Sequence, residues 1–401
     1  MIKVLPYSII LLLFLLSHNI SRSEVLDAYQ FINYGIGEGL SQSTVLCSYQ
    51  DSHGFIWLGT RDGLNQFDGY NFKIFRNIPG DSTSIQDNYI NYITGDAQKN
   101  IWIATNEGLS KYNLDHPYFC NYRLNISGTD PEIRTIQIFP GNKLWIGSKD
   151  GIFELDQIAN KFYKPNHPLV SAVANKYVTT IFTDGDKNIW VGTTNGLFFY
   201  DKIINEVTCF HTKLSGKNYI SHPRIEAIKQ NKEGQIWVGT YGGGVNLIDP
   251  QKGYLNHLDD HVDPVNKLTN NYVRSLVIDE DENLWIGTFK GLNIYDQAQD
   301  KITRIHHNFL NKKGLSHGSI RSLLKDKKGS IWIGTYMGGL NIFDKDNQNF
   351  LHYYHMPHRN NSLSHDVVSD FIKDNTGNFF IATERGGLNY FNVSEKSFIQ
   401  I

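Results

Sequence analysis

The chain has 401 residues, with 38 Lys and Arg against 40 Asp and Glu, a net charge of −2. This balance argues against a nucleic-acid-binding protein, which needs a basic surface to meet phosphate, and a hydrophobic content of 40% excludes a disordered chain. The 35 glycines, without a Gly-X-Y period, and an aromatic content of 13% indicate short strands joined by tight turns. The composition therefore predicts an all-β protein in which the seven tryptophans need an explanation.

The N-terminal segment 1–23 has the features of a secretory signal peptide. Lys3 is the only charge before an apolar run over about 5–16, and Ser21 and Ser23 place small residues where a signal peptidase reads them. The run is shorter than the roughly 20 residues that a membrane span needs. We expect cleavage near Ser23 and export of the rest of the chain; an uncleaved anchor or a buried helix is the alternative.

Three cysteines are spread along the chain. Cys47, Cys120 and Cys209 are far apart, odd in number, and each lies in a strand-like run. A disulfide framework needs more cysteines in pairs, and no CxxC pair or Cys/His cluster indicates a metal. We interpret all three as small buried hydrophobic residues.

A fragment with the pattern Ile-Trp-Ile-Gly-Thr recurs along the chain. All seven tryptophans occupy one column of this repeat at spacings of 43 to 48 residues, and a weaker eighth copy over 379–383 carries a phenylalanine there. Chance does not place every tryptophan of a chain in one column, so we interpret the column as structural. Its members are Trp57, Trp102, Trp145, Trp190, Trp237, Trp285, Trp332 and Phe380.

Each repeat contains four short strand signals. In the sixth repeat they cover 272–278, 284–288, 292–295 and 302–305, with a tight turn at Gly291. Four antiparallel strands in a unit of about 45 residues, repeated seven or more times, are typical of a β-propeller. A solenoid of separate sheets is the rival fold, but closure into a ring protects sheet edges better.

The repeated residues also predict how the blades pack. A blade packs on its neighbours through both faces, which explains why the Ile-Trp-Ile run is apolar on both sides. We expect the tryptophans to fill the gaps between blades. The glycine that follows most of the tryptophans by two positions should let the next backbone approach closely.

The number of blades is left open by the sequence. Seven strong repeats over 24–356 predict a seven-bladed propeller, and the extended piece 30–34 could supply a strand to its last blade. The degenerate eighth repeat, over 357–401, is then the first blade of a second, truncated propeller. The alternative is one ring of eight blades.

The repeats resemble those of two-component regulator propeller proteins. The resemblance rests on the copy over 51–68, which reads Asp-Ser-His-Gly-Phe-Ile-Trp-Leu-Gly-Thr-Arg-Asp-Gly-Leu-Asn-Gln-Phe-Asp, and on a second good copy over 326–344. The segment 31–41 also resembles the beginning of such sensors. Together the similar repeats cover about residues 30–392.

This resemblance implies the periplasmic sensor part of a hybrid two-component histidine kinase and response regulator. In such proteins a second propeller, a β-sandwich, a membrane helix, a kinase and its phosphorelay modules usually follow, and many of these sensors detect oligosaccharides and regulate polysaccharide utilisation. The chain ends at Ile401 without kinase motifs. We therefore expect a fragment or truncated product that is not itself an enzyme.

The resemblance further implies an oligosaccharide ligand and a homodimer of the full-length sensor, with membrane attachment only through segments beyond this chain. We expect no cofactor, no nucleic-acid partner and no metal. The acidic turns over 184–188 and 279–283 resemble the start of a calcium loop. Their twelfth positions, however, hold Asn195 and Lys290 in place of the bidentate glutamate that such a loop needs.

The residue after each Gly-Thr pair varies around the expected ring, and variable side chains on a constant scaffold are suited to recognition. Three consecutive aromatic residues here could stack on sugar rings, and two basic residues could meet an acidic group. The alternative is that these side chains pack locally or cover an interface. The candidate ligand-binding residues are Arg61, Lys149, Tyr241, Phe289, Tyr336 and Arg385; the last follows the eighth member of the column.

Two other classes of function remain open at this stage. A propeller enzyme, either quinoprotein dehydrogenase-like or active on polysaccharides, would reveal itself by turnover or by bound quinone. A protein-interaction scaffold would depend on a partner and bind no small ligand. We expect the sensor because the repeats contain no catalytic constellation.

Overall fold

The computed structural model describes residues 29–124, 132–212, 218–261, 267–345 and 353–401. The expected signal peptide over 1–23 lies outside the described residues. The chain divides into two compact units, one ending at Lys345 and one beginning at Asp346. Each unit is described by itself below, as unit 1 and unit 2.

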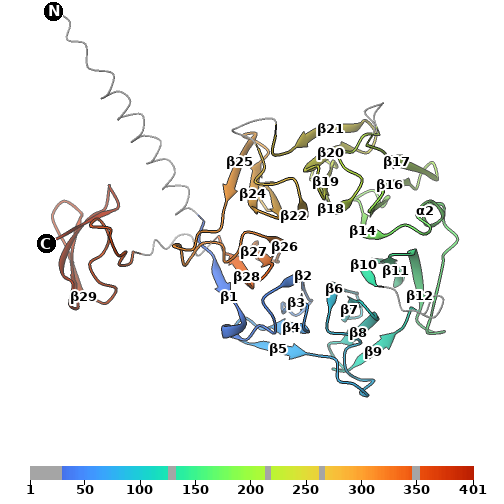
Figure 1. Cartoon of the computed structure of the whole chain (residues 1–401), viewed down its shortest axis with the longest axis horizontal. Helices are drawn as coiled ribbons and strands as arrows, with labels where there is room; N and C mark the ends of the chain where they lie inside the picture. The colour runs from blue at the N-terminus through green and yellow to red at the C-terminus, as the bar shows by residue number, and fades with distance from the viewer. Residues whose placement is uncertain (1–28, 125–131, 213–217, 262–266, 346–352) are drawn as a thin grey trace, which may run out of the picture. The chain divides into compact units, whose positions relative to one another are not determined.

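Within its described residues, unit 1 contains seven four-stranded antiparallel sheets, which we call blades 1 to 7 (Figure 1). Blades 1 to 3 consist of β2 (Val45–Gln50), β3 (Ile56–Thr60), β4 (Leu64–Phe67) and β5 (Phe72–Phe75); β6 (Ile90–Gly95), β7 (Asn100–Thr105), β8 (Gly108–Asn113) and β9 (Phe119–Tyr122); and β10 (Ile133–Phe139), β11 (Lys143–Ser148), β12 (Gly151–Asp156) and β13 (Lys161–Tyr163).

The next three blades follow the same plan, because each carries the same spacing of apolar runs and turn residues. Blades 4 to 6 consist of β14 (Val178–Thr183), β15 (Ile189–Thr193), β16 (Gly196–Asp201) and β17 (Glu206–Phe210); β18 (Ile225–Gln230), β19 (Ile236–Thr240), β20 (Val245–Asp249) and β21 (Gly253–Leu258); and β22 (Val273–Ile278), β23 (Leu284–Thr288), β24 (Gly291–Asp296) and β25 (Lys301–Ile305).

Blade 7 joins the two ends of unit 1. Its strands β26 (Ile320–Lys325), β27 (Ile331–Thr335) and β28 (Leu340–Phe343) are completed by β1 (Ile32–Tyr34), which pairs antiparallel with β28. The first strands of the seven blades, β2, β6, β10, β14, β18, β22 and β26, each contact the next, and β26 contacts β2. The fold is therefore an all-β propeller whose ring is closed by the extended N-terminal piece (Figure 1).

Helical structure within the described residues is minor. The 3-10 helix η1 (Ile36–Glu38) follows β1, and α2 (Pro168–Ala172) packs beside β16 and β17. His167 caps α2 by accepting a hydrogen bond from the backbone N–H of Leu169 at 3.2 Å. No helix among the described residues has both the length and the apolar character that crossing a bilayer requires.

The seven tryptophans lie in the gaps between blades. Trp57 of blade 1 belongs to one buried cluster with Ile90 and Ile101 of blade 2, and Trp332 of blade 7 packs with Val45 and Leu58 of blade 1. Six of the seven side chains are at most 2% exposed and Trp332 is 7% exposed. Burial of such large aromatic groups is a main source of stability for the ring.

Most of these indoles also make a hydrogen bond that the sequence analysis did not anticipate. In blades 1, 2, 4, 6 and 7 the indole N–H donates, over 2.7 to 3.0 Å, to the aspartate six residues earlier. In blade 3 Glu154 takes that role for Trp145, at 2.8 Å. Blade 5 differs, because Asn231 replaces the aspartate and the Trp237 N–H has no partner among the described residues.

The glycine two positions after the tryptophan meets the next blade in two ways. In blade 7 a Cβ on Gly334 would come within 2.8 Å of the Val45 backbone carbonyl oxygen, which is the close backbone approach that was expected, but other blades differ. A Cβ on Gly59 would come within 2.6 Å of the Ile90 side chain in blade 2, and one on Gly192 within 2.7 Å of the Ile225 side chain in blade 5. What approaches at these two positions is therefore a β-branched side chain of the next inner strand, not its backbone. Because these glycines have no side chain, the isoleucine of the next blade can pack directly against them, and this contact sets the spacing between the blades.

Unit 2 contains one four-stranded antiparallel sheet within its described residues. Its burial differs from that of the ring, because Phe371 and Ile372 on its first strand are 65% and 68% exposed and Phe380 is only partly buried. This sheet, taken by itself, leaves uncovered the faces that propeller blades bury against each other. Its strands are β29 (Val368–Lys373), β30 (Phe379–Thr383), β31 (Gly387–Asn392) and β32 (Ser397–Gln400).

Candidate functional site

Each inner strand of unit 1 carries an irregularity near its beginning. In all seven blades the register with the second strand shifts between the first and third residues, so the second residue lies in a β-bulge. A bulge removes a residue from the ladder and re-aims its side chain, and bulges are frequent beside functional sites. The second residues are Leu46, Asn91, Arg134, Thr179, Glu226, Arg274 and Arg321.

These bulged residues line a central cavity of about 610 Å³, to which all seven inner strands contribute. The inner strands surround the centre of the ring in Figure 1. The bulges lie where the inner strands begin, so their side chains gather at one end of the cavity, which we call the rim. Deeper in the cavity, Lys229 keeps solvent-accessible surface, yet the surrounding ring desolvates the ammonium and lowers its pKa.

Three of the residues predicted to bind a ligand lie at this rim. The backbone N–H groups of Tyr241, Phe289 and Tyr336 donate hydrogen bonds to the carbonyl groups of residues just before the inner strands of their own blades. These bonds hold the variable column beside the bulged residues. Propeller geometry therefore brings two variable columns, one recognised in the sequence and one not, to the same end of the ring.

Arginines cover the three aromatic rings. The guanidinium carbon of Arg224 lies 4.2 Å from the ring centre of Tyr241, and that of Arg274 lies 4.7 Å from the ring centre of Phe289. Tyr336 faces two such groups, Arg61 at 5.0 Å and Arg321 at 5.5 Å. Stacking of this kind fixes the guanidinium groups in place and occupies part of the aromatic surface that was expected to meet a sugar.

The other two predicted residues lie apart from this cluster. Lys149 is exposed on the turn between β11 and β12, and within the described residues no hydrogen bond or ion pair joins it to the arginines. Arg385 belongs to unit 2, where it has a left-handed backbone with φ of 63°. Of the six predicted residues, four are thus found at the rim.

One side of the rim, at blades 3 to 5, has balanced charges. Arg134 contacts Glu132 at 3.1 Å and Arg224 contacts Glu226 at 2.6 Å. The Tyr177 hydroxyl also donates to Glu132, at 2.7 Å. Burial opposes the charge of Arg134, but Tyr177, Glu132 and Glu226 more than offset it and raise the pKa of this guanidinium.

The opposite side of the rim, at blades 6, 7 and 1, carries three arginine side chains. Within the described residues no carboxylate forms an ion pair with Arg61, Arg274 or Arg321, and the buried Nε atoms of all three lack hydrogen-bond partners. Arg274 does donate from Nη1 to the Ser319 hydroxyl, at 2.8 Å. Burial, followed by the charge of Arg274, lowers the pKa of Arg321.

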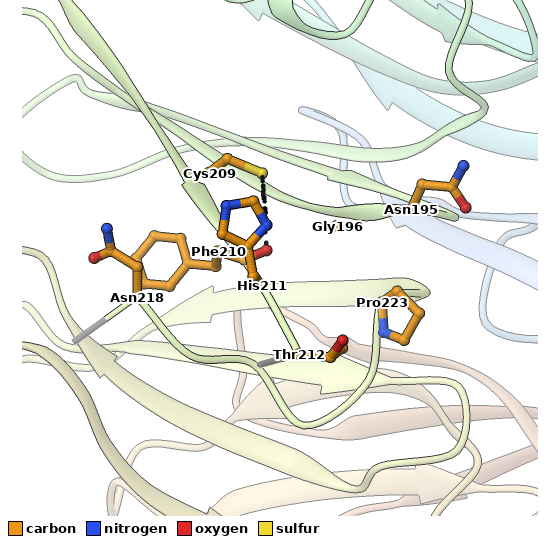
Figure 2. Close-up of a pocket in the computed structure, with 8 residues that line it drawn as sticks. All are labelled: Asn195, Gly196, Cys209, Phe210, His211, Thr212, Asn218 and Pro223. Carbon is orange, nitrogen blue, oxygen red and sulfur yellow. Dashed lines mark hydrogen bonds between the residues drawn. The ribbon is translucent and has the colours of Figure 1, made fainter. Parts of the chain in front are cut away.

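A second cavity, of about 490 Å³, lies beside the outer strand of blade 4 (Figure 2). Cys209 and His211 face each other there with 3.9 Å between Sγ and Nδ1. Burial raises the pKa of the Cys209 thiol, which is the opposite of what an activated nucleophile needs. This cavity therefore offers no cysteine chemistry.

The described part of the chain contains no group of three or more His, Cys, Asp or Glu side chains placed to hold an ion. In the acidic turn at 184–188, the Asp184 carboxylate accepts hydrogen bonds from the Asn188 backbone at 2.8 Å and the Trp190 indole at 3.0 Å. The Asp184 oxygens therefore accept hydrogen bonds that hold the turn and fix the Trp190 side chain.

Comparison with known families identifies the repeats. Five stretches match the family described as two component regulator propeller, and each runs from the link before an inner strand into the turn after the second strand. This chain carries two-component regulator propeller repeats. The matched stretches are residues 39–62, 84–107, 172–195, 267–290 and 314–337.

Solved structures of two extracellular domains are similar to this chain over most of its length. The extracellular domain attributed to a hybrid two component system of B. thetaiotaomicron is 26% identical, with a TM-score of 0.68 over 93% of this chain and 54% of that one. A second extracellular domain from the same organism, attributed to a one component system, shares the fold at 22% identity and a TM-score of 0.62, over 93% of this chain and 54% of that chain. This chain spans about half the length of either solved domain.

One curated relative matches over a short region. A protein named histidine kinase P4, from Formosa agariphila, is 65% identical over 48 residues, which are 12% of this chain and 4% of that protein. The matching segment is about as long as one propeller repeat, and it belongs to a much longer protein.

Proposed function

We propose that this propeller is the ligand-sensing part of an exported two-component sensor. The observation that carries the proposal is the set of regulator propeller repeats in a chain similar, over 93% of its length, to an extracellular domain of a hybrid two-component system. The sensor acts by binding, and its catalytic output lies in other modules. Export to the periplasm through an N-terminal signal peptide is part of the same proposal.

The ligand we propose is an oligosaccharide, through which the sensor regulates polysaccharide utilisation. Two features of the rim support this. The first is aromatic side chains at the variable positions of consecutive blades, which suit sugar rings. The second is a set of guanidinium groups able to donate several hydrogen bonds each to sugar oxygens. Binding would then bias the arrangement of two copies in the full-length dimer.

The test is calorimetric titration of the purified chain with a panel of neutral and acidic oligosaccharides. Saturable binding of at least one glycan, without any change in the glycan on prolonged incubation, is the expected result. A folded chain that binds none of them overturns the oligosaccharide proposal. Breakdown of a bound glycan, or a quinone bound to the purified protein, would favour an enzyme instead.

A further inference from the structure

The positive side of the rim has a geometry that suits a more specific ligand. We propose that Arg61, Arg274 and Arg321 form a site for an anionic group, a carboxylate or sulfate carried by the sensed oligosaccharide. The inference rests on the proposed sensing function and assigns both the chemical class of the ligand and the residues that select it.

The three side chains converge although they come from three blades. Arg61 and Arg321 both lie against the ring of Tyr336, at 5.0 and 5.5 Å from its centre. Arg274, one blade earlier, reaches the Ser319 hydroxyl at 2.8 Å, just before the strand that carries Arg321. The beginning of blade 7 is therefore the common meeting place of all three guanidinium groups.

No described carboxylate neutralises the charges of this cluster. Buried polar groups in folded proteins are nearly always hydrogen-bonded, so three buried Nε donors without partners within the described residues need an explanation. Like charges held close together also repel each other. An anion between the guanidinium groups would remove both unfavourable contributions. It would accept hydrogen bonds from the unpaired Nε donors, and its negative charge would offset the repulsion between the arginines.

The cluster is organised in advance of binding. Each guanidinium lies over an aromatic ring, Tyr336 for two of them and Phe289 for the third, so part of the side-chain freedom is already lost before a ligand binds. Arginine also presents planar, paired N–H donors that match the two oxygens of a carboxylate or sulfate. These features select for a planar or tetrahedral oxyanion over a neutral hydroxyl group.

The surroundings favour a glycan as the carrier of that anion. The overall charge of the chain is −2, so the positive rim is a local feature and not part of a broad basic surface for nucleic acid. Phe289 is 47% exposed beside the cluster and can meet a sugar face. The central cavity of about 610 Å³ adjoins the cluster and has the size of a small-molecule site.

The experiment uses three probes: a galacturonic acid trisaccharide, the corresponding neutral galactose trisaccharide, and sodium sulfate. Each is titrated into the purified chain and into two variants, Arg321→Gln and Arg274→Gln. The control is Lys301→Gln, which removes one exposed positive charge from the outer strand β25. Thermal unfolding verifies that every variant is folded.

We expect the acidic trisaccharide to bind more tightly than the neutral one and to weaken as salt is added. Either arginine variant should lose about tenfold or more in affinity for it, and Lys301→Gln should match the unsubstituted chain. Sodium sulfate should compete with the trisaccharide in the unsubstituted chain.

The outcomes separate the two proposals. If a neutral glycan binds and neither the acid group nor the arginine substitutions change affinity, the anion site is wrong and sensing stands. If sulfate binds through Arg321 but no glycan does, the anion site stands and oligosaccharide sensing is wrong. If nothing binds to the folded chain, both are overturned.

Discussion

The rim of the central cavity has two sides that are built alike and charged differently. Arg134 of blade 3 and Arg321 of blade 7 occupy the same bulged position of their inner strands. The pKa of Arg134 is raised above its ordinary value and that of Arg321 is lowered. Burial opposes the charge at both positions, so the neighbours decide the direction.

This difference shows that the same bulged position can carry a compensated arginine in one blade and an uncompensated arginine in another. Where Glu132 and Glu226 face the arginines, the charges are compensated inside the protein. At blades 6, 7 and 1, where no described carboxylate pairs with the arginines, the ring holds positive charges together at a cost in stability. Proteins commonly accept such a cost at functional sites, where the missing partner is supplied by a ligand.

The largest effect should come from removing the compensated arginine. Arg134→Met leaves Glu132 without its ion-pair partner, whereas Glu226 keeps Arg224, and it should lower the free energy of unfolding by about 2 kcal/mol. A fully buried pair would cost more, but the Arg134 side chain is 30% exposed. Urea denaturation measures the change; a variant as stable as the unsubstituted chain would mean that this side is not held together by its charges.

The same substitution on the other side should have the opposite sign. Arg321→Met removes a desolvated charge that faces Arg274 and keeps an apolar stem against Tyr336. We expect the free energy of unfolding to rise by about 1 kcal/mol. Unfolding in low and high salt gives the control, because salt should stabilise the unsubstituted chain more than the variant. Destabilisation by Arg321→Met would contradict the division of the rim into two sides.

A change in the blade framework should alter stability without altering either side. Asn231→Asp restores the acceptor that other blades use, and the Trp237 N–H gains a partner. We expect the free energy of unfolding to increase by about 1 kcal/mol. The rim carries no part of this hydrogen bond, so binding of the acidic trisaccharide should stay the same. A change in affinity would show that stability and binding are coupled through the blades.

The smallest expected effect is a loss of stability at mildly acidic pH. Burial lowers the pKa of His222, near blade 5, and of His317, which lies beside Tyr336 of blade 7. For His222 the hydrogen bond from the Arg224 backbone N–H raises the pKa and the Arg224 charge lowers it, while for His317 the neighbouring His307 adds to the lowering. Below pH 6.5 these two histidines bind protons in the unfolded chain but remain largely neutral in the folded chain. The free energy of unfolding should therefore be highest above that pH and should decline as the pH falls.

His317→Gln keeps an acceptor for the Ser319 backbone N–H and removes this titration. Urea denaturation between pH 7.5 and 5.5 should give a flatter pH dependence for this variant, and His222→Gln should do the same on the compensated side. An unchanged slope in both variants would locate the acid sensitivity elsewhere.

Much of the fold could be read from the repeat. One tryptophan per 43 to 48 residues, with the glycine turns between strands, leads to four-stranded blades without any knowledge of the structure. The aspartate six residues before the tryptophan, present in five of the seven blades, was visible in the same pattern, but its hydrogen bond to the indole was missed. That bond depends on the angle at which the turn folds back over the ring, which residue spacing does not reveal.

The candidate site was only half predictable. The variable column containing Tyr336 follows a conspicuous Gly-Thr pair and could be found by aligning the repeats. The column of bulged residues follows no such marker, and Arg274 and Arg321 look like ordinary alternating polar residues of a strand. A bulge changes where a side chain points without changing the residue order, so only the backbone geometry reveals it.

By itself the sequence determined the repeating blade, its buried tryptophan and its turns, because these depend on contacts within one repeat and its neighbour. Only the tertiary structure decided which distant residues meet. Closure of the ring through β1 and blade 7 places Arg61 against Tyr336, although they lie at opposite ends of unit 1. The distribution of Glu132 and Glu226 around that closed ring then leaves one side of the rim neutral and the other positive.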